Sequence, residues 1–129
     1  MSFFFNAPLG FIGGIVSWLF QGTNYGYASG GYVGPSTSTA IDKFPFASDA
    51  NATPVGALTS PPRFASAGQS SSVSGYASGG QAPPVIYDAI EKFPFASDGN
   101  ATEVGNLTKD IAKAAGQTST ESGYTSGNL

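Results

Sequence analysis

Carboxylates at two spacings are the residues of this chain that could carry out chemistry. Asp88 and Glu91 lie three positions apart, while Asp49 and Asp98 occupy matching places in two copies of one phrase. Two carboxyl groups that flank a sugar are what most glycoside hydrolases use. Because Asp49 and Asp98 stand in equivalent turns, where Asp side chains bond to nearby backbone, we interpret them as turn residues. A hydrolase would lose its activity on Asp49→Asn or Asp98→Asn, and we expect no such activity.

The same two turns resemble the first half of a calcium-binding loop. Each has the pattern Asp-x-Asn-x-Thr, over residues 49–53 and 98–102, but neither has the glycine at the sixth position or the distal glutamate. The chain has no Cys and no His, which excludes disulfides, Ser–His catalysis and Cys/His zinc sites. The sequence therefore predicts no catalytic residue, no metal and no cofactor.

Charge is scarce in this chain. Five basic and eight acidic residues give a net charge of −3, and no basic cluster that would bind nucleic acid is present. Lys43 and Lys92 follow Asp42 and Glu91 in the sequence, so we interpret them as locally balanced lysines on solvated strand edges. Nucleic acid is therefore not an expected partner.

A motif of about fifty residues organises the chain. The sequence GYASGG of residues 26–31 returns at 75–80 and, as GYTSG, at 123–127, and KFPFASD of residues 43–49 returns at 92–98. This period is the size of one blade of a propeller, a unit that cannot bury its apolar face alone. We divide the chain into an arm at 1–24, a first repeat at 25–80, and a second repeat with a closing strand at 81–129.

The second repeat reads as about four short strands. Tyr76–Ser78 should end at Gly79-Gly80, where φ > 0 is permitted, and residues 81–84 should form a loop. Residues 85–92 alternate between two faces, as a strand does, and Pro94 should end the pairing. Residues 102–107 predict a third strand and 114–125 a hairpin.

One segment differs between the repeats. Residues 109–115 could form a helical turn, but the matching Ser60–Arg63 contains two prolines that forbid a helix. We therefore expect a variable loop in both copies, in an all-β fold.

Aromatic residues recur at matching positions in the repeats. Because their placement is the same in each copy, we expect them to pack within or between repeats before any other role. If the tyrosines were exposed instead, they could stack on sugar rings. The residues are Tyr27, Tyr76, Tyr124, Phe44, Phe46, Phe93 and Phe95.

The N-terminal 24 residues carry no charge and are apolar over residues 7–20, and three interpretations compete. A signal peptide lacks its basic region here, and a membrane helix is weakened by Pro8 and three glycines. We favour an arm that other protein subunits cover, with a short amphipathic helix over about residues 11–20. Its anchoring residues would be Phe11, Ile15, Trp18, Leu19 and Phe20.

Two resemblances follow from these phrases. A strand ending in Gly-Gly, then an aromatic-bearing strand and a strand leading back, resembles a kelch-type repeat, although Phe46 and Phe95 stand where kelch blades have tryptophan. The phrase KFPFASD together with GY(A/T)SG more closely resembles arrays in structural proteins of marine bacteriophages, over residues 25–127. That resemblance implies a virion protein, most plainly of the tail, acting by assembly.

The phase of the repeat suggests how such a subunit assembles. The repeat region begins and ends on the same Gly-Tyr strand, so two units are followed by one spare strand. Closed propellers need four to eight blades, so three chains of two repeats would give six. We expect a homo-oligomer, with a trimer or a multiple of three preferred, alongside other virion proteins. Alternatively, the repeats pack on the edge of a larger host protein by strand addition. The alternative is an adhesin module that binds host glycans through its loops.

Overall fold

The fold is all-β, as the sequence predicts. The computed structural model describes residues 24–59 and 61–127, and within them the regular elements are all strands. The expected arm, with Phe11, Ile15, Trp18, Leu19, Phe20 and the helix over 11–20, lies outside the described residues.

The first sheet belongs wholly to the first repeat. It consists of β1 (Tyr25–Val33), β2 (Ser36–Pro45) and β3 (Thr53–Ala57), antiparallel and in that order. β1 and β2 form a long hairpin in which Gly26 lies opposite Phe44. A Cβ at Gly26 would meet the ring of Phe44, so the ring covers the glycine that faces it across the ladder.

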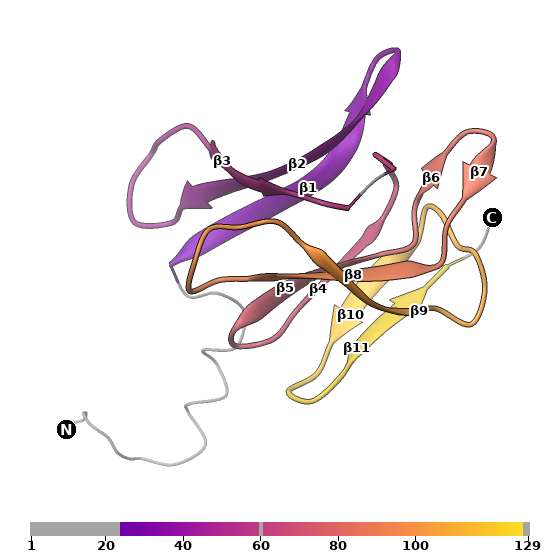
Figure 1. Ribbon diagram of the computed structural model, residues 1–129. Helices are drawn as coiled ribbons and strands as arrows, with labels where there is room; N and C mark the ends of the chain where they lie inside the picture. Colours follow the sequence, from indigo (N-terminus) through magenta and orange to yellow (C-terminus); the bar gives the residue numbers. More distant parts are fainter. Residues whose placement is uncertain (1–23, 60, 128–129) are drawn as a thin grey trace.

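The second sheet draws strands from both repeats. β4 (Ala67–Ser70) joins β5 (Ser74–Ser78), β8 (Ala89–Pro94) and β9 (Thr102–Asn106) in the order β4-β5-β8-β9. The last two strands, β10 (Ala115–Thr118) and β11 (Gly123–Ser126), form a separate hairpin. Figure 1 shows the first sheet above the second and the yellow hairpin below, three layers in chain order.

The repeats map onto these layers strand by strand. β5, β8 and β9 correspond to β1, β2 and β3, and β10–β11 corresponds to β4–β5 in the same register, with Gln117 opposite Tyr124 as Gln69 is opposite Tyr76. Counted from one Gly-Tyr strand to the next, the first repeat has the expected four strands, and the second has the four corresponding strands and two more of two residues each. A full layer takes its first strand from the preceding repeat. Within residues 24–59 and 61–127, the first sheet has no counterpart of β4, and the β10–β11 hairpin has no counterparts of β8 and β9.

One predicted strand is divided. The sequence pattern predicts a single strand over 85–92 after a loop at 81–84, whereas the structure has β6 (Gln81–Ala82) and β7 (Val85–Ile86) as a short hairpin before β8. Gly79 and Gly80 have φ of 67° and 108°, as expected, and turn the chain away from the sheet. The Tyr87 N–H then donates to the Gly80 carbonyl, which holds the base of the hairpin.

The core lies between the two sheets, and five of the eight buried hydrophobic residues in the described part of the chain are alanines. Ile41 and Leu58 of the first repeat pack with Ala77, Phe93 and Ala101 of the second. A Cβ at Gly56 would meet the Gly99 carbonyl oxygen, and one at Gly116 would meet that of Gly68. Small side chains therefore let neighbouring layers approach closely, and burial between repeats stabilises the fold.

Candidate functional site

The boundary between the repeats is held by the phrase that the sequence repeats. Lys43 Nζ donates to Asp98 Oδ1 at 2.7 Å, so the lysine pairs with the next repeat and not with its neighbour Asp42. This hydrogen bond raises the pKa of Lys43 above its ordinary value, with a further contribution from the Asp98 charge. Local charge balance was therefore the wrong interpretation of Lys43, because strand alternation points it at the neighbouring layer.

The Asp-x-Asn-x-Thr turn of the second repeat contacts the first. Asn100 Oδ1 accepts a hydrogen bond from the Ala57 N–H at 3.1 Å, and the Ala101 N–H donates to the Ala57 carbonyl at 2.8 Å. Within residues 24–59 and 61–127, no group of three acidic residues is placed to hold a metal ion. The carboxylate and amide of this turn thus serve the contact between layers.

Aromatic stacking crosses the same boundary. The ring of Tyr27 lies on that of Phe95, with centroids 4.9 Å apart and planes 20° apart, and 5.6 Å from the ring of Phe93. Phe93 is 5% exposed. Burial raises the pKa of Tyr27, and Lys43 opposes this shift.

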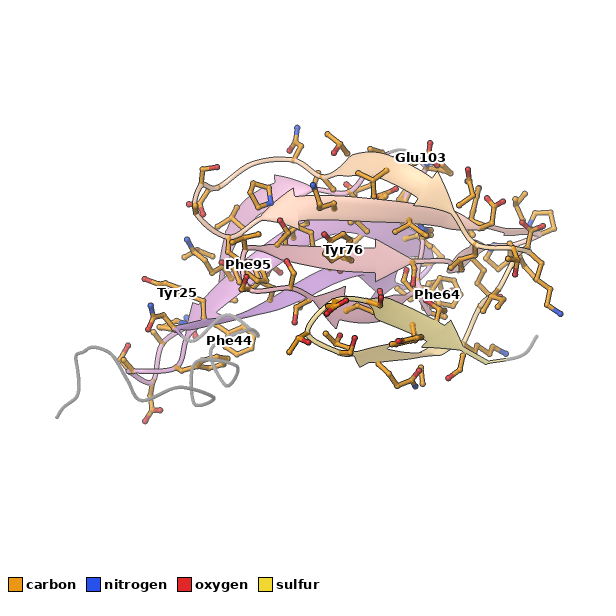
Figure 2. The ribbon with its side chains drawn as sticks, turned by 90° about the horizontal axis from the view of Figure 1, so that it is seen from below. Tyr25, Phe44, Phe64, Tyr76, Phe95 and Glu103 are labelled. Atoms are coloured by element: carbon orange, nitrogen blue, oxygen red, sulfur yellow. The ribbon has the colours of Figure 1, made fainter. Side chains whose placement is uncertain are left out.

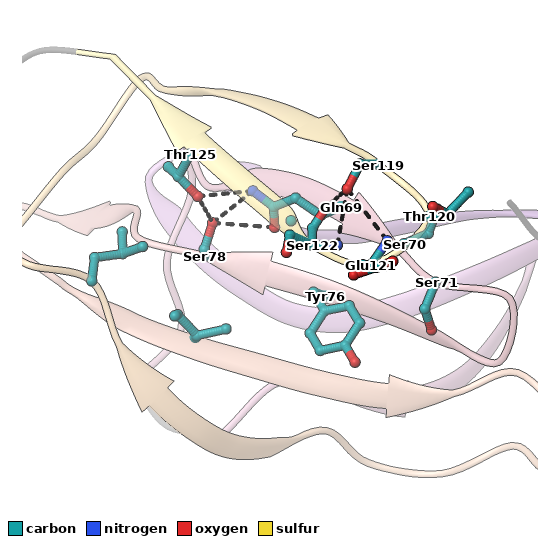
Figure 3. A pocket seen from close by; sticks show the side chains of 13 residues that line it. Gln69, Ser70, Ser71, Tyr76, Ser78, Ser119, Thr120, Glu121, Ser122 and Thr125 are labelled. Atoms are coloured by element: carbon teal, nitrogen blue, oxygen red, sulfur yellow. Dashed lines mark hydrogen bonds between the residues drawn. The ribbon is translucent and has the colours of Figure 1, made fainter. Parts of the chain in front are cut away.

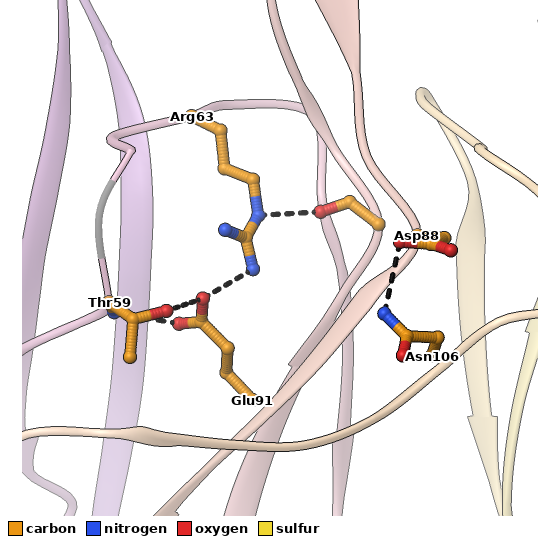
Figure 4. A network of polar contacts seen from close by, with 6 residues as sticks. Thr59, Arg63, Asp88, Glu91 and Asn106 are labelled. Atoms are coloured by element: carbon orange, nitrogen blue, oxygen red, sulfur yellow. Dashed lines mark hydrogen bonds and ion pairs between the residues drawn. The ribbon is translucent and has the colours of Figure 1, made fainter.

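A buried ion pair also joins the repeats (Figure 4). Arg63 Nη2 donates to Glu91 Oε2 at 2.8 Å, and the two side chains are 1% and 0% exposed. Arg63 Nε donates to the Gly79 carbonyl at 2.8 Å, and Thr59 donates to the Glu91 carboxylate from its N–H and its hydroxyl. Both charges are therefore matched by hydrogen bonds, as buried charges require.

The terminal hairpin is fastened to the second sheet by a polar cluster (Figure 3). Gln69 Nε2 donates to the Tyr124 carbonyl at 3.0 Å and to Thr125 Oγ1 at 2.9 Å. The hydroxyls of Ser78 and Thr125 lie 2.6 Å apart. β11 thus lies over β4 and β5, as a third layer.

These arrangements leave no pair of free carboxylates for hydrolysis among the candidates that the sequence offered. Glu91 is sealed in the ion pair, and Asp88 Oδ1 accepts a hydrogen bond from Asn106 Nδ2 at 3.1 Å. Asp98 is bound by Lys43. The groups nearest to chemistry are therefore engaged in holding strands and repeats together.

Residues equivalent to those at the boundary are exposed or only partly buried at the two ends of the stack. We call the outer side of the first sheet the front face, formed by Asp42, Phe44, Phe46, Asp49 and Asn51. The back face is the outer side of the second sheet, formed by Tyr76, Ile90, Lys92, Gly105 and Leu107. Phe44 and Phe46 are 38% and 59% exposed, and a Cβ at Gly105 would meet no atom within 4 Å. Figure 2 labels Phe44 and Tyr76 among these side chains.

Two pockets adjoin these faces. One of about 310 Å³ has Tyr76, Ile90 and Leu107 on one side and the turn between β10 and β11 on the other. A second, of about 360 Å³, lies along β1 from Tyr25 to Ser29 and against β4. The first is where strands equivalent to β2 and β3 would follow, and the second is where a strand equivalent to β4 would precede β1.

The recurring aromatic residues have unequal surroundings. Phe95 and Tyr76 are partly buried, whereas Tyr124 is 55% exposed on β11. Arg63 and Gln69 were missed by sequence reasoning. The only signal for Arg63 was a lone charge in a Pro-Pro-Arg segment, and Gln69 was marked merely by its repetition at Gln117.

No protein-family model and no curated protein sequence matches this chain. Among the described residues, no helix has the length and apolar character to cross a membrane.

Proposed function

We propose that this chain is a non-enzymatic structural subunit of a virion, most plainly of a phage tail, which assembles through its β repeats. The observation that carries the assembly proposal is that equivalent residues are covered in the middle of the stack of layers and exposed at its ends. Inside the chain Phe93 is buried and Asp98 is paired with Lys43, whereas their equivalents Phe44 and Asp49 are exposed. Assignment to a virion rests on the resemblance of the repeated phrases to phage structural arrays.

The assembly is a homo-oligomer, a trimer or a multiple of three, in contact with other virion proteins. Closure of six repeats from three chains would leave no repeat with an open face. The apolar arm at residues 1–24 anchors the subunit or plugs a channel, through Phe11, Ile15, Trp18, Leu19 and Phe20. Protein covers the arm in preference to lipid.

The native mass of the full chain tests this proposal. Light scattering after size exclusion should give a mass that rises with concentration toward three chains or a multiple of three. A chain that stays monomeric up to the highest soluble concentration would overturn assembly through the repeats. Loss of particle attachment on deletion of residues 1–24 would support the anchor, and unchanged incorporation would contradict it.

One observation favours a second function, the binding of a host glycan. The pocket of about 310 Å³ places the Tyr76 ring among hydroxyl-bearing side chains such as Ser71 and Ser119. A ring beside several hydroxyls is a common arrangement for binding a sugar. On a glycan array, Tyr76→Ala should abolish a signal that Tyr32→Ala, a matched change at an exposed tyrosine, leaves intact.

A further inference from the structure

The covered side of the first sheet shows what the back face is built to bind. Ile41 and Leu58 are 0% and 4% exposed because the second sheet covers them, while their equivalents Ile90 and Leu107 are only partly buried. Lys43 reaches Asp98, while its equivalent Lys92 is exposed and forms no ion pair with any described residue. The back face therefore carries the same groups as the covered face, but of the described strands only the β10–β11 hairpin lies against it, and a pocket separates the turn of that hairpin from Tyr76, Ile90 and Leu107.

The front face carries the groups that such a layer would bring. Asp49 is equivalent to Asp98, and Asn51 is equivalent to Asn100. The ring of Phe44 is equivalent to that of Phe93, and the ring of Phe46 to that of Phe95. Ala52 is exposed, whereas its equivalent Ala101 is 4% exposed beneath the first repeat. Charge is complementary too, because the front face has Asp42 and Asp49 and the back face has Lys92.

We propose that the back face of one chain binds the front face of a second copy of this chain, head to tail. Lys92 pairs with Asp49 of the second copy as Lys43 pairs with Asp98, and Tyr76 stacks on its Phe46 as Tyr27 stacks on Phe95. Asn51 of the second copy accepts from the Asn106 N–H as Asn100 accepts from that of Ala57. The contact is heterologous, so it builds a closed ring or an open stack. This inference rests on the proposed function, because it names the surface through which the subunit assembles.

The terminal strand β11 holds the place that β1 of the second copy takes. β11 has the Gly-Tyr-Thr-Ser sequence where β1 has Gly-Tyr-Ala-Ser, and it pairs with β10 in the register that β5 uses with β4. Exchange of β11 for the incoming β1 places β10 along the open edge of β1. That edge borders the pocket of about 360 Å³. A single exchange therefore gives β1 of the second copy a neighbouring strand, in the position that β4 has beside β5.

Charge reversal in the full chain tests the pairing. Sedimentation velocity over a concentration series should show that Lys92→Asp alone and Asp49→Lys alone each weaken self-association about tenfold, because like charges then face each other. An equimolar mixture of the two variants should restore association, since the lysine introduced at position 49 of one chain then meets the aspartate introduced at position 92 of the other. Matched controls are Lys43→Asp and Asp98→Lys, which break the pair within the chain and should leave association near the wild-type value.

A second variant tests the exchange of strands. Thr125→Ala removes the hydroxyl that bonds to Gln69 and Ser78 and gives β11 the alanine that β1 has at Ala28. The weaker hold of β11 should raise the association constant about fivefold for a lost hydrogen bond. No rise, in a variant whose circular dichroism matches the wild type, would overturn the exchange.

The outcomes separate this inference from the proposed function. If the chain assembles but Lys92→Asp behaves like Lys43→Asp, or the mixture fails to recover, head-to-tail binding is overturned and assembly by another surface remains. If the wild-type chain is a monomer at every concentration, both proposals fail.

Discussion

Two copies of one sequence motif have different surroundings in this molecule. Phe93 in the second copy is 5% exposed beneath Tyr27, while Phe44 in the first is 38% exposed, although both follow lysine and precede Pro-Phe. Glu91 is fully buried with Arg63, whereas Asp42 at the same position is half-buried. The difference arises from the neighbour, because each layer becomes a core only where another repeat lies on it.

The largest difference in stability between the two copies is expected at the buried charge of Glu91. Glu91→Gln leaves Arg63 without its counter-charge and should lower the free energy of unfolding by about 3–5 kcal/mol. Asp42→Asn changes the equivalent position, where no described residue forms an ion pair, and should cost less than about 1 kcal/mol. Urea denaturation followed by circular dichroism measures both. Equal costs would mean that the Arg63–Glu91 pair does not hold the repeats together.

Replacing both charges adds a control for the cost of burial. Arg63→Met with Glu91→Leu removes two buried charges together and should recover much of the stability that either single change loses. If the double variant is as unstable as Glu91→Gln, the hydrogen bonds of Thr59 and Gly79 matter more than the pairing of charges.

The aromatic pair gives the next largest contrast. Phe93→Ala removes a ring packed against Tyr27 and covering Gly75, and should cost about 3–5 kcal/mol. Phe44→Ala removes a half-exposed ring that covers Gly26 and meets the edge of Phe46, and should cost about 1–2 kcal/mol. Both values are for dilute protein, by denaturant titration. The difference between the two losses of stability should become smaller at concentrations where the chain associates. A difference that does not change with concentration would indicate that Phe44 stays uncovered.

The sequence predicted the strands well and their surroundings poorly. Alternation, Gly-Gly turns and prolines are local signals, so the hairpin over 114–125 and the strand over 102–107 are found close to where they were expected. The partner of Lys43 is Asp98, which lies 55 residues away and follows from the stacking of layers. Arg63 was assigned to a variable loop because its segment differs between repeats, and only the fold brings it to Glu91.

Gly56 lies where two layers approach closely, whereas Gly105 lies on the back face with no neighbouring atom against it. Gly56→Ala should cost about 1–3 kcal/mol, because its Cβ would press on the backbone of Gly99, which cannot move without shifting the layer. Gly105→Ala meets open space and should be neutral or stabilising by about 0.4–1 kcal/mol through the unfolded state. Thermal unfolding of dilute protein measures both, and equal costs would show that the layers do not depend on a glycine contact.

The smallest expected effect is a change of stability with pH, which should depend on Lys43 and not on its equivalent Lys92. The pKa of Lys43 is raised by its hydrogen bond to Asp98, and that of Tyr27 is raised by burial. Above their ordinary values of 10.5 and 10.0, the unfolded chain holds fewer protons at these groups than the folded chain, so stability falls as pH rises through the folded pKa values. Below about pH 9 both contributions should be fully present.

Thermal unfolding between about pH 8 and about pH 11.5 checks this. Asp98→Asn should remove part of the loss of stability at alkaline pH, and Tyr27→Phe should remove another part of it. Lys92→Met should leave the decline of dilute protein unchanged, because Lys92 has no partner among the described residues. If Lys92→Met flattens the curve as much as Asp98→Asn does, the alkaline loss comes from general charge and not from the boundary between repeats. Because the same lysine would gain its partner on head-to-tail binding, the Lys92→Met curve should depart from wild type only where the chain associates.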